Sequence, residues 1–158
     1  MPQMQHILSL DPGGTTGYCH GVYDGNKLVL TPGQEKFNES ELFKFMHEHW
    51  QKNFYLIYER FHYRNKARPG LDLTPTRLIG VIELFCQTEG IKYFAQMPSE
   101  AMGYWTDDQL RRFGVYVKGL QHGRDAMRHM LQWWQFKYGF GIHKITPFTN
   151  YEVKLDNS

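Results

Sequence analysis

The order of apolar and polar positions along the chain predicts strands that alternate with helices. Three short apolar runs, residues 6–11, 17–23 and 28–31, are separated by a Pro-Gly-Gly turn and by the hairpin sequence Asp24-Gly25-Asn26-Lys27. Short turns of this kind are typical of antiparallel strands that follow one another directly in the sequence. Apolar residues at helical spacing then predict a helix from Asn38 or Ser40 to about Gln51. The run 55–59 is expected to lie parallel to the first strand, because a helical connection joins parallel strands.

The second half continues the alternation after an irregular stretch from Arg60 to Gly70. The pattern predicts a helix that starts at Thr74-Pro75 and ends near Gly90, then a strand over 91–96. A weaker helical region over 98–113, a last helix over about 122–138, and loop and tail over 139–158 follow. The expected fold class is α/β, with a five-stranded mixed sheet of three antiparallel and then two parallel strands, flanked by helices on both faces. A chain of 158 residues without repeat or linker predicts one domain, with its core over 6–138.

Composition narrows the functional classes. No apolar run approaches the length of a membrane span, and the first residues lack a basic segment followed by an apolar one, so we expect neither a membrane protein nor a signal peptide. Cys19 and Cys86 are the only cysteines and form no Cys-x-x-Cys pair, which argues against a thiolate zinc site. Two unpaired thiols favour a reducing compartment, so we expect a cytoplasmic protein.

Charge is unevenly distributed. Residues 1–59 carry 4 Lys and Arg against 7 Asp and Glu, whereas residues 60–158 carry 14 against 9. This asymmetry hints that the second half faces a polyanion, although a split of this size also occurs in proteins that bind no nucleic acid.

Four residues with acid or base chemistry occur at predicted element ends. Asp11 closes the first apolar run, and Glu59 closes the run 55–59. His122 and Asp125 are three residues apart at the start of the last helix, so they share one helix face. Three carboxylates and an imidazole that converge on one point would form a site for divalent metal ions.

These motifs and the order of elements resemble the RuvC-type Holliday junction resolvases, which have the ribonuclease H-like fold, and in particular short versions of the bacteriophage type. The resemblance rests on Asp11-Pro12-Gly13-Gly14-Thr15-Thr16-Gly17, on Leu56-Ile57-Tyr58-Glu59-Arg60 and on His122-Gly123-Arg124-Asp125-Ala126, and it spans residues 6–138. It implies a metal-dependent endodeoxyribonuclease that nicks four-way junctions symmetrically, binds branched DNA as a homodimer and uses no nucleotide cofactor.

Hydrolysis of a phosphodiester explains the residue types. Two divalent ions about 4 Å apart can activate the attacking water and neutralise the leaving oxygen. Asp11 would bridge two Mg²⁺ or Mn²⁺ ions, Glu59 and Asp125 would ligate them, and His122 would be a nitrogen ligand or a proton shuttle. Each residue also has an ordinary structural explanation as a turn former, a solvated acid or a helix-terminal residue. His129, seven residues after His122 on roughly the same helix face, is interpreted first as a packed or exposed histidine, with a supporting partner of the site as the alternative.

Two further surfaces are assigned from the sequence. The stretch after Glu59 interleaves cations with aromatic rings, which suits phosphate neutralisation and base stacking, although a solvated loop would look similar. Its expected DNA-binding residues are Arg60, Phe61, His62, Tyr63, Arg64, Lys66 and Arg68. The helix from Pro75 to Glu89 is apolar around most of its circumference, so it is buried on more than one side. The resemblance implies that this helix contributes to dimerisation, and the expected contacts are Leu78, Ile82 and Phe85; burial within one subunit is the alternative.

Four other functions remain open from the sequence. The turn from Asp11 to Gly17 also resembles the phosphate-binding turn of actin-like and sugar-kinase ATPases, although those need two such domains. The chain could be a YqgF-like relative that acts on RNA, a non-catalytic binder of DNA structures, or a less selective nuclease for forks and flaps.

The aromatic residues of the last helix are interpreted as core residues rather than base-stacking ones: Trp133, Trp134 and Phe136.

Overall fold

The computed structural model describes residues 3–61, 70–138 and 150–155, which form one mixed sheet with helices on both sides. The strand order in the sheet is β5-β4-β1-β2-β3-β6. β1 pairs antiparallel with β2, and β2 with β3, while β4, β5 and β6 join their neighbours in parallel. The strands are β1 (Gln5–Asp11), β2 (Thr16–Tyr23), β3 (Lys27–Glu35), β4 (Phe54–Glu59), β5 (Lys92–Gln96) and β6 (Asn150–Val153). The antiparallel meander and the parallel return of β4 beside β1 confirm the predicted arrangement.

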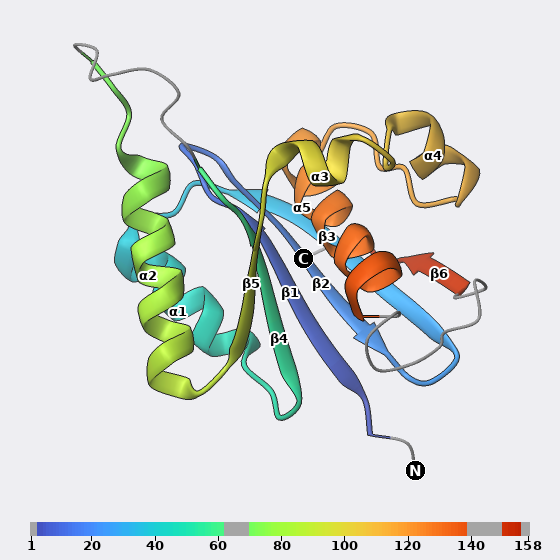
Figure 1. Cartoon of the computed structure of the whole chain (residues 1–158), viewed down its shortest axis with the longest axis horizontal. Coiled ribbons are helices and arrows are strands. Elements are labelled where there is room, and N and C mark those ends of the chain that lie inside the picture. Colours follow the sequence, from blue (N-terminus) through green and yellow to red (C-terminus); the bar gives the residue numbers. More distant parts are fainter. Residues whose placement is uncertain (1–2, 62–69, 139–149, 156–158) are drawn as a thin grey trace.

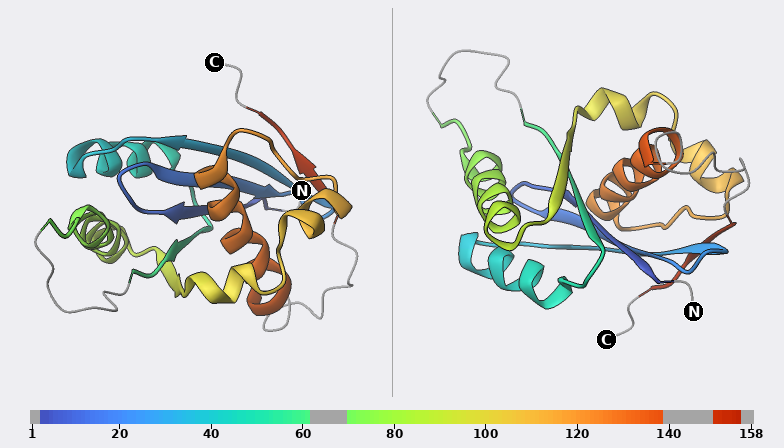
Figure 2. Two further views of the ribbon diagram at one scale, coloured as in Figure 1. Left: turned by 90° about the horizontal axis from the view of Figure 1, so that it is seen from above. Right: turned by 60° about the horizontal axis from the view of Figure 1, so that its bottom comes forward.

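The helices divide between the two faces of the sheet (Figures 1 and 2). One face carries α1 (Glu39–His49) and α2 (Thr74–Glu89), and the other carries α3 (Pro98–Met102), α4 (Asp107–Arg112), α5 (Gln121–Gln132) and the π-helical turn η1 (Trp133–Tyr138). Asn38 caps α1 in a capping box with Glu41, as its sequence predicts. Side chains alternate between the faces, so Ile7 and Ile57 pack under α5 while Leu8 and Leu56 pack under α1 and α2.

Two predicted boundaries are wrong, for identifiable physical reasons. We expected the third strand to end before Pro32, but β3 continues to Glu35, and Pro32 pairs with Cys19 of β2. β6 pairs with Lys27–Leu30, and no other described strand borders β3 beside Pro32, so a missing N–H is tolerated there as at a sheet edge. The tail expected over 139–158 contributes β6, a sixth strand whose partner in the sheet is distant in sequence.

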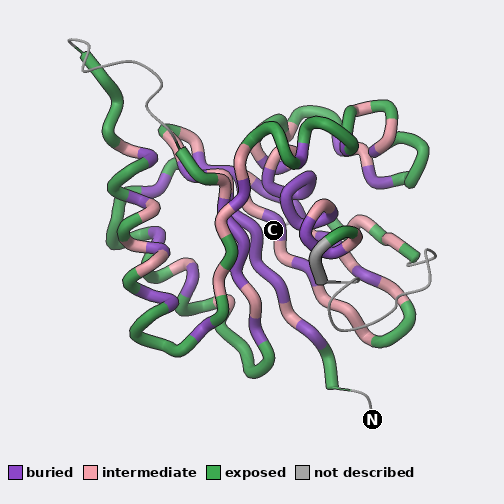
Figure 3. Tube along the Cα trace, in the orientation of Figure 1, coloured by how far each residue is buried: buried purple, intermediate pink, exposed green. Residues whose placement is uncertain are grey.

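Burial is concentrated in the central strands and on the inner sides of the helices (Figure 3). Trp133 and Trp134 are buried, which confirms that interpretation, but Phe136 is exposed and contacts the ring of Tyr104. None of the described helices is both long enough and apolar enough to cross a membrane.

The expected dimer contacts on α2 require a correction. Leu78, Ile82 and Phe85 are each 0% exposed and belong to the core that α1 and α2 form with the sheet. They are buried because α1 covers the side of α2 that we had assigned to a second subunit. These three side chains therefore stabilise the single chain, and a partner could contact α2 only through its outer side, where Leu84 is 63% exposed.

Candidate metal centre

The sheet register brings the carboxylates of Asp11 and Glu59 to neighbouring strand ends. Leu10 of β1 is aligned with Tyr58 of β4, so the next residues, Asp11 and Glu59, end the two strands at the same level. Two residues before Glu59, Ile57 belongs to the core beneath α5, and two residues before Asp11, the hydroxyl of Ser9 donates to the carbonyl of Ala126 in α5 at 2.6 Å. Because side chains in a strand alternate, both carboxylates project towards α5. Gln96 of β5 is aligned with Glu59 and extends this polar row by one strand.

Close backbone contacts fix the N-terminus of α5 over the same edge. A Cβ on Gly17 would lie 1.8 Å from the carbonyl oxygen of His122, and a Cβ on Gly123 would lie 2.8 Å from that of Gly33. The two glycines thus allow the helix to approach the strands more closely than any other residue type would. The side chain of Gln34 accepts a hydrogen bond from the backbone N–H of His122 at 3.1 Å, which caps the first turn.

This packing unites three of the four predicted site residues. Asp11, His122 and Asp125 each offer one ligand atom, and these atoms lie within 4.8 Å of one another. His122 Nδ1 is 3.9 Å from Asp11 Oδ2. Two carboxylate oxygens and one imidazole nitrogen form a donor set that suits Mg²⁺ or Mn²⁺, with the nitrogen favouring Mn²⁺.

The electrostatics of Asp11 also fit a cation. Burial, and after it the negative charges of Glu59 and Asp125, together raise the pKa of its carboxyl group from an ordinary 3.8 to about 8. The protein thus gathers negative charge at a partly buried point where the carboxylates repel one another. A divalent cation bound there would relieve this repulsion, so the residues present fit a metal centre.

Glu59 is the predicted residue that lies outside the group of three ligands. It influences the charge on Asp11, but its Oε2 is hydrogen-bonded to Nε2 of His129 at 2.8 Å. The other ring nitrogen of His129 is 2.8 Å from Oε1 of Gln96. His129 is 1% exposed, so it is packed as expected, and it is also the partner of the site that the sequence left open.

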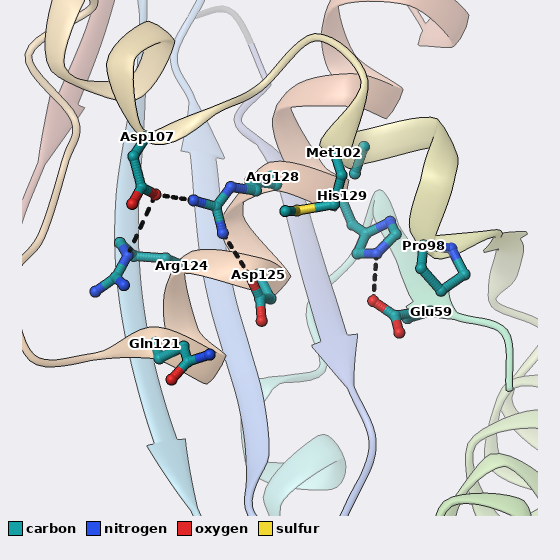
Figure 4. A pocket seen from close by; sticks show the side chains of 10 residues that line it. Glu59, Pro98, Met102, Asp107, Gln121, Arg124, Asp125, Arg128 and His129 are labelled. Carbon is teal, nitrogen blue, oxygen red and sulfur yellow. Dashed lines mark hydrogen bonds and ion pairs between the residues drawn. The ribbon is translucent and has the colours of Figure 1, made fainter.

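A cleft of about 380 Å³ opens beside the group and is lined by Glu59 and Asp125 together with α3, α4 and α5 residues (Figure 4). Arg128 bridges across its wall, with Nη1 2.5 Å from Asp125 Oδ1 and Nη2 on Asp107 Oδ1. Arg124 lies on the same side, and its Nε is 3.9 Å from Asp107 Oδ1.

Sequence reasoning missed three residues here, Gln96, Asp107 and Arg128, and left the part of His129 open. Gln96 had a signal, as a polar side chain that ends an apolar strand. His129 had one too, since it shares a helix face with His122. No pattern marked Asp107, because it begins a short helix in a polar stretch whose position depends on packing.

The predicted DNA-binding stretch is described only at its start. Arg60 is exposed beside Glu59, and its backbone N–H donates to the carbonyl of Gln96 at 2.7 Å. Phe61 is 41% exposed. His62, Tyr63, Arg64, Lys66 and Arg68 lie outside the described residues, so their assignment stays a prediction.

Comparisons with solved structures decide the fold. No family model and no curated protein matches the sequence. The structure titled Thermus thermophilus RuvC in complex with a Holliday junction substrate matches with a TM-score of 0.64 and 16% identity, over 88% of this chain and 97% of that one. The chain has the RuvC fold. Thermus thermophilus RuvC alone gives a TM-score of 0.59 at 16% identity over 81% of this chain and 92% of that one.

A eukaryotic protein shares the RuvC fold as well. The yeast mitochondrial Holliday junction resolvase Ydc2 matches with a TM-score of 0.56 and 15% identity, over 82% of this chain and 77% of that one. The mixed α/β class and the resemblance drawn from the sequence are thereby confirmed at the level of the fold. At such identities the chemistry has to be argued from the residues of this chain.

Proposed function

We propose that this protein is a metal-dependent, structure-selective endodeoxyribonuclease that nicks four-way DNA junctions. The observation that carries the proposal is the convergence of Asp11, His122 and Asp125 at one edge of a sheet with the RuvC fold. The matches to RuvC in complex with a Holliday junction substrate and to the yeast Holliday junction resolvase Ydc2 support four-way DNA as the substrate.

Each side chain has a role in this proposal. Asp11 would be the central ligand, because the charges of both Glu59 and Asp125 act on its carboxyl group, and Asp125 and His122 would supply ligands from α5. Glu59 completes the acidic set from the end of β4. Two Mg²⁺ or Mn²⁺ ions, when bound, would lower the pKa of the attacking water and neutralise the charge on the leaving oxygen. The cations and rings of residues 60–68 would hold the phosphates and bases beside the site.

A symmetric junction presents two equivalent strands, so we infer that a two-fold homodimer presents two sites to it. The exposed apolar side chains Phe43 and Leu84 on the outer sides of α1 and α2 support a contact there rather than through the buried residues first expected. Sedimentation at micromolar concentration tests this directly: a monomer that still makes paired nicks would reject it.

Free, buried Cys19 and Cys86 are compatible with a cytoplasmic place of action, in the host if the protein comes from a bacteriophage.

A cleavage assay tests the activity. A synthetic four-way junction is incubated with Mg²⁺ or Mn²⁺ and wild type, Asp11→Asn or Asp125→Asn. Asp108→Asn serves as the matched control, because this carboxylate is 88% exposed on α4. We expect paired symmetric nicks from wild type and the control, and a loss of at least about 100-fold in both site variants.

The same assay separates the remaining alternatives. Forks and flaps cut as fast as the junction would make the protein a general branched-DNA nuclease. Junction binding without nicking in either metal would make it a non-catalytic binder. In Ca²⁺, the site variants should bind the junction as wild type does, whereas Arg64→Ala with Arg68→Ala should weaken binding and flatten its dependence on salt.

A further inference from the structure

Two consecutive residues of α5 contact the two carboxylates that flank Asp11. Arg128 contacts Asp125, and His129 contacts Glu59. Both are buried, at 5% and 1% exposure, although arginine and histidine are seldom so enclosed without specific partners. Neighbouring residues in a helix project about 100° apart, so one side chain can reach towards α4 while the next reaches towards β4. Figure 4 shows the contact of Arg128 with Asp125 in the middle of the view and the contact of His129 with Glu59 to its right.

Arg128 is held by three groups. Its Nη1 donates to Asp125 Oδ1 at 2.5 Å, its Nη2 to Asp107 Oδ1, and its Nε to the backbone carbonyl of Trp105 at 2.7 Å. A planar guanidinium with three partners in different directions has almost no freedom to turn. Trp105 is itself fully buried, so Asp125 is positioned by the packed segment between α3 and α4.

His129 is held in the same manner on the other side. One ring nitrogen meets Glu59 and the other meets Gln96, each at 2.8 Å. Gln96 is fully buried and is aligned with Glu59 in the parallel pairing of β4 with β5. A rigid ring between two strand-end side chains fixes the direction in which Glu59 points.

We propose that Arg128 and His129 are positioning residues that hold Asp125 and Glu59 at the spacing that the metal centre needs. The inference rests on the proposed metal-dependent function. The acidic side chains gathered around Asp11 carry like charges and repel one another, so without these contacts they would turn towards water. Arg128 and His129 hold the carboxylates in place before any cation binds. Fewer side-chain rotations are then lost on binding, so the cation binds more tightly.

Metal affinity in the absence of DNA provides the test. Mn²⁺ binding is measured by calorimetry on wild type, Arg128→Met, His129→Leu and Gln96→Leu, with thermal melting in chelator to confirm that each variant is folded. We expect Mn²⁺ affinity to fall 10- to 100-fold in the first two variants and less in Gln96→Leu, which touches no carboxylate of the site. The control is His47→Leu, an exposed histidine on α1, and should bind as wild type does.

Conservative variants separate positioning from a general role in folding. His129→Gln keeps an N–H that can donate to Glu59, and Arg128→Lys keeps one charge for Asp125, so both should recover part of the lost affinity. The Mn²⁺ electron paramagnetic resonance spectrum should broaden in Arg128→Met and return towards wild type in Arg128→Lys.

The outcomes distinguish this inference from the proposed function. Wild-type Mn²⁺ affinity in folded Arg128→Met and His129→Leu would overturn the inference while junction cleavage by wild type still stands. Equal loss in the leucine and glutamine variants at position 129 would also overturn it, because the donor to Glu59 would then be irrelevant. No Mn²⁺ binding by wild type would overturn both. Weakened Mn²⁺ binding without cleavage of any DNA by wild type would sustain the inference and reject the nuclease.

Discussion

Replacing Asp11 by asparagine should make the metal-free protein more stable. The carboxyl group lies in a partly buried position near two other acids, and its pKa is raised to about 8. Asparagine has almost the same shape and carries no charge. The variant therefore keeps the packing at the end of β1 and removes the repulsion.

The pKa of Asp11 sets the size of the effect. Between its ordinary value of 3.8 and about 8, the folded state holds a proton that the unfolded chain has released. The free energy of unfolding of the wild type therefore falls as pH rises through this window. The two values give an upper limit of about 5 kcal/mol at pH 8 and a change of about 2 kcal/mol between pH 6 and pH 8. The three acids titrate together, so this amount belongs to the group rather than to Asp11 alone.

Urea unfolding in chelator at pH 6, 7 and 8 measures the effect, with Asp108→Asn as the matched control. The difference between variant and wild type cancels groups that titrate elsewhere in the chain. We expect Asp11→Asn to be more stable than wild type by an amount that grows with pH, while the control shows no such trend. Added Mn²⁺ should stabilise wild type in proportion to RT ln(1 + [Mn²⁺]/Kd) and leave Asp11→Asn nearly unchanged.

A constant stability difference across this pH range would refute the reasoning, because it would show that Asp11 is already ionised below pH 6 in the metal-free fold. Lower stability of Asp11→Asn at every pH would indicate instead that the carboxylate is a structural hydrogen-bonding group.

Three other predictions follow from the packing. Gly17→Ala should lower the free energy of unfolding by about 3 kcal/mol and weaken Mn²⁺ binding, because its methyl group would displace the backbone at His122. Gly14→Ala is the control: a Cβ there has no neighbour within 4 Å among the described residues, so this variant should match wild type in urea melts and calorimetry. Asn38→Ala should cost about 1 kcal/mol in a urea melt through loss of the α1 cap, and an unchanged melt would mean that the helix N-terminus does not depend on it. Burial, with the nearby His49 and His6, lowers the pKa of His20 to about 4. As pH falls from 6.5 to 4 the unfolded chain is protonated before the folded protein, so the free energy of unfolding decreases by at most about 3 kcal/mol. In urea melts over this pH range, His20→Asn should make that decrease smaller.

Much of the fold could be predicted because its signals are local. The turn at Asp24-Gly25, the Asn38 cap and the alternation of apolar runs are each decided within a few residues. The continuation of β3 through Pro32 could not be predicted, since it depends on where the distant β6 stops pairing. The burial of Leu78 likewise depends on α1 covering that side of α2.

The candidate site divides in the same way. Asp11, Glu59, His122 and Asp125 could be selected because each stands at an element end, where a polar side chain interrupts an apolar pattern. Their order and spacing also resemble those of one enzyme family. The contacts of Arg128 with Asp107 and of His129 with Glu59 could not be selected, because these partners lie in other elements of the chain.

The sequence by itself determined which residues could bind a cation and on which elements they lie, because hydrophobic periodicity and turn chemistry act over short distances. Only the tertiary structure decided that Asp11, His122 and Asp125 meet while Glu59 turns to His129. That outcome depends on strand register and on how closely α5 approaches Gly17, and both result from packing between residues far apart in the chain.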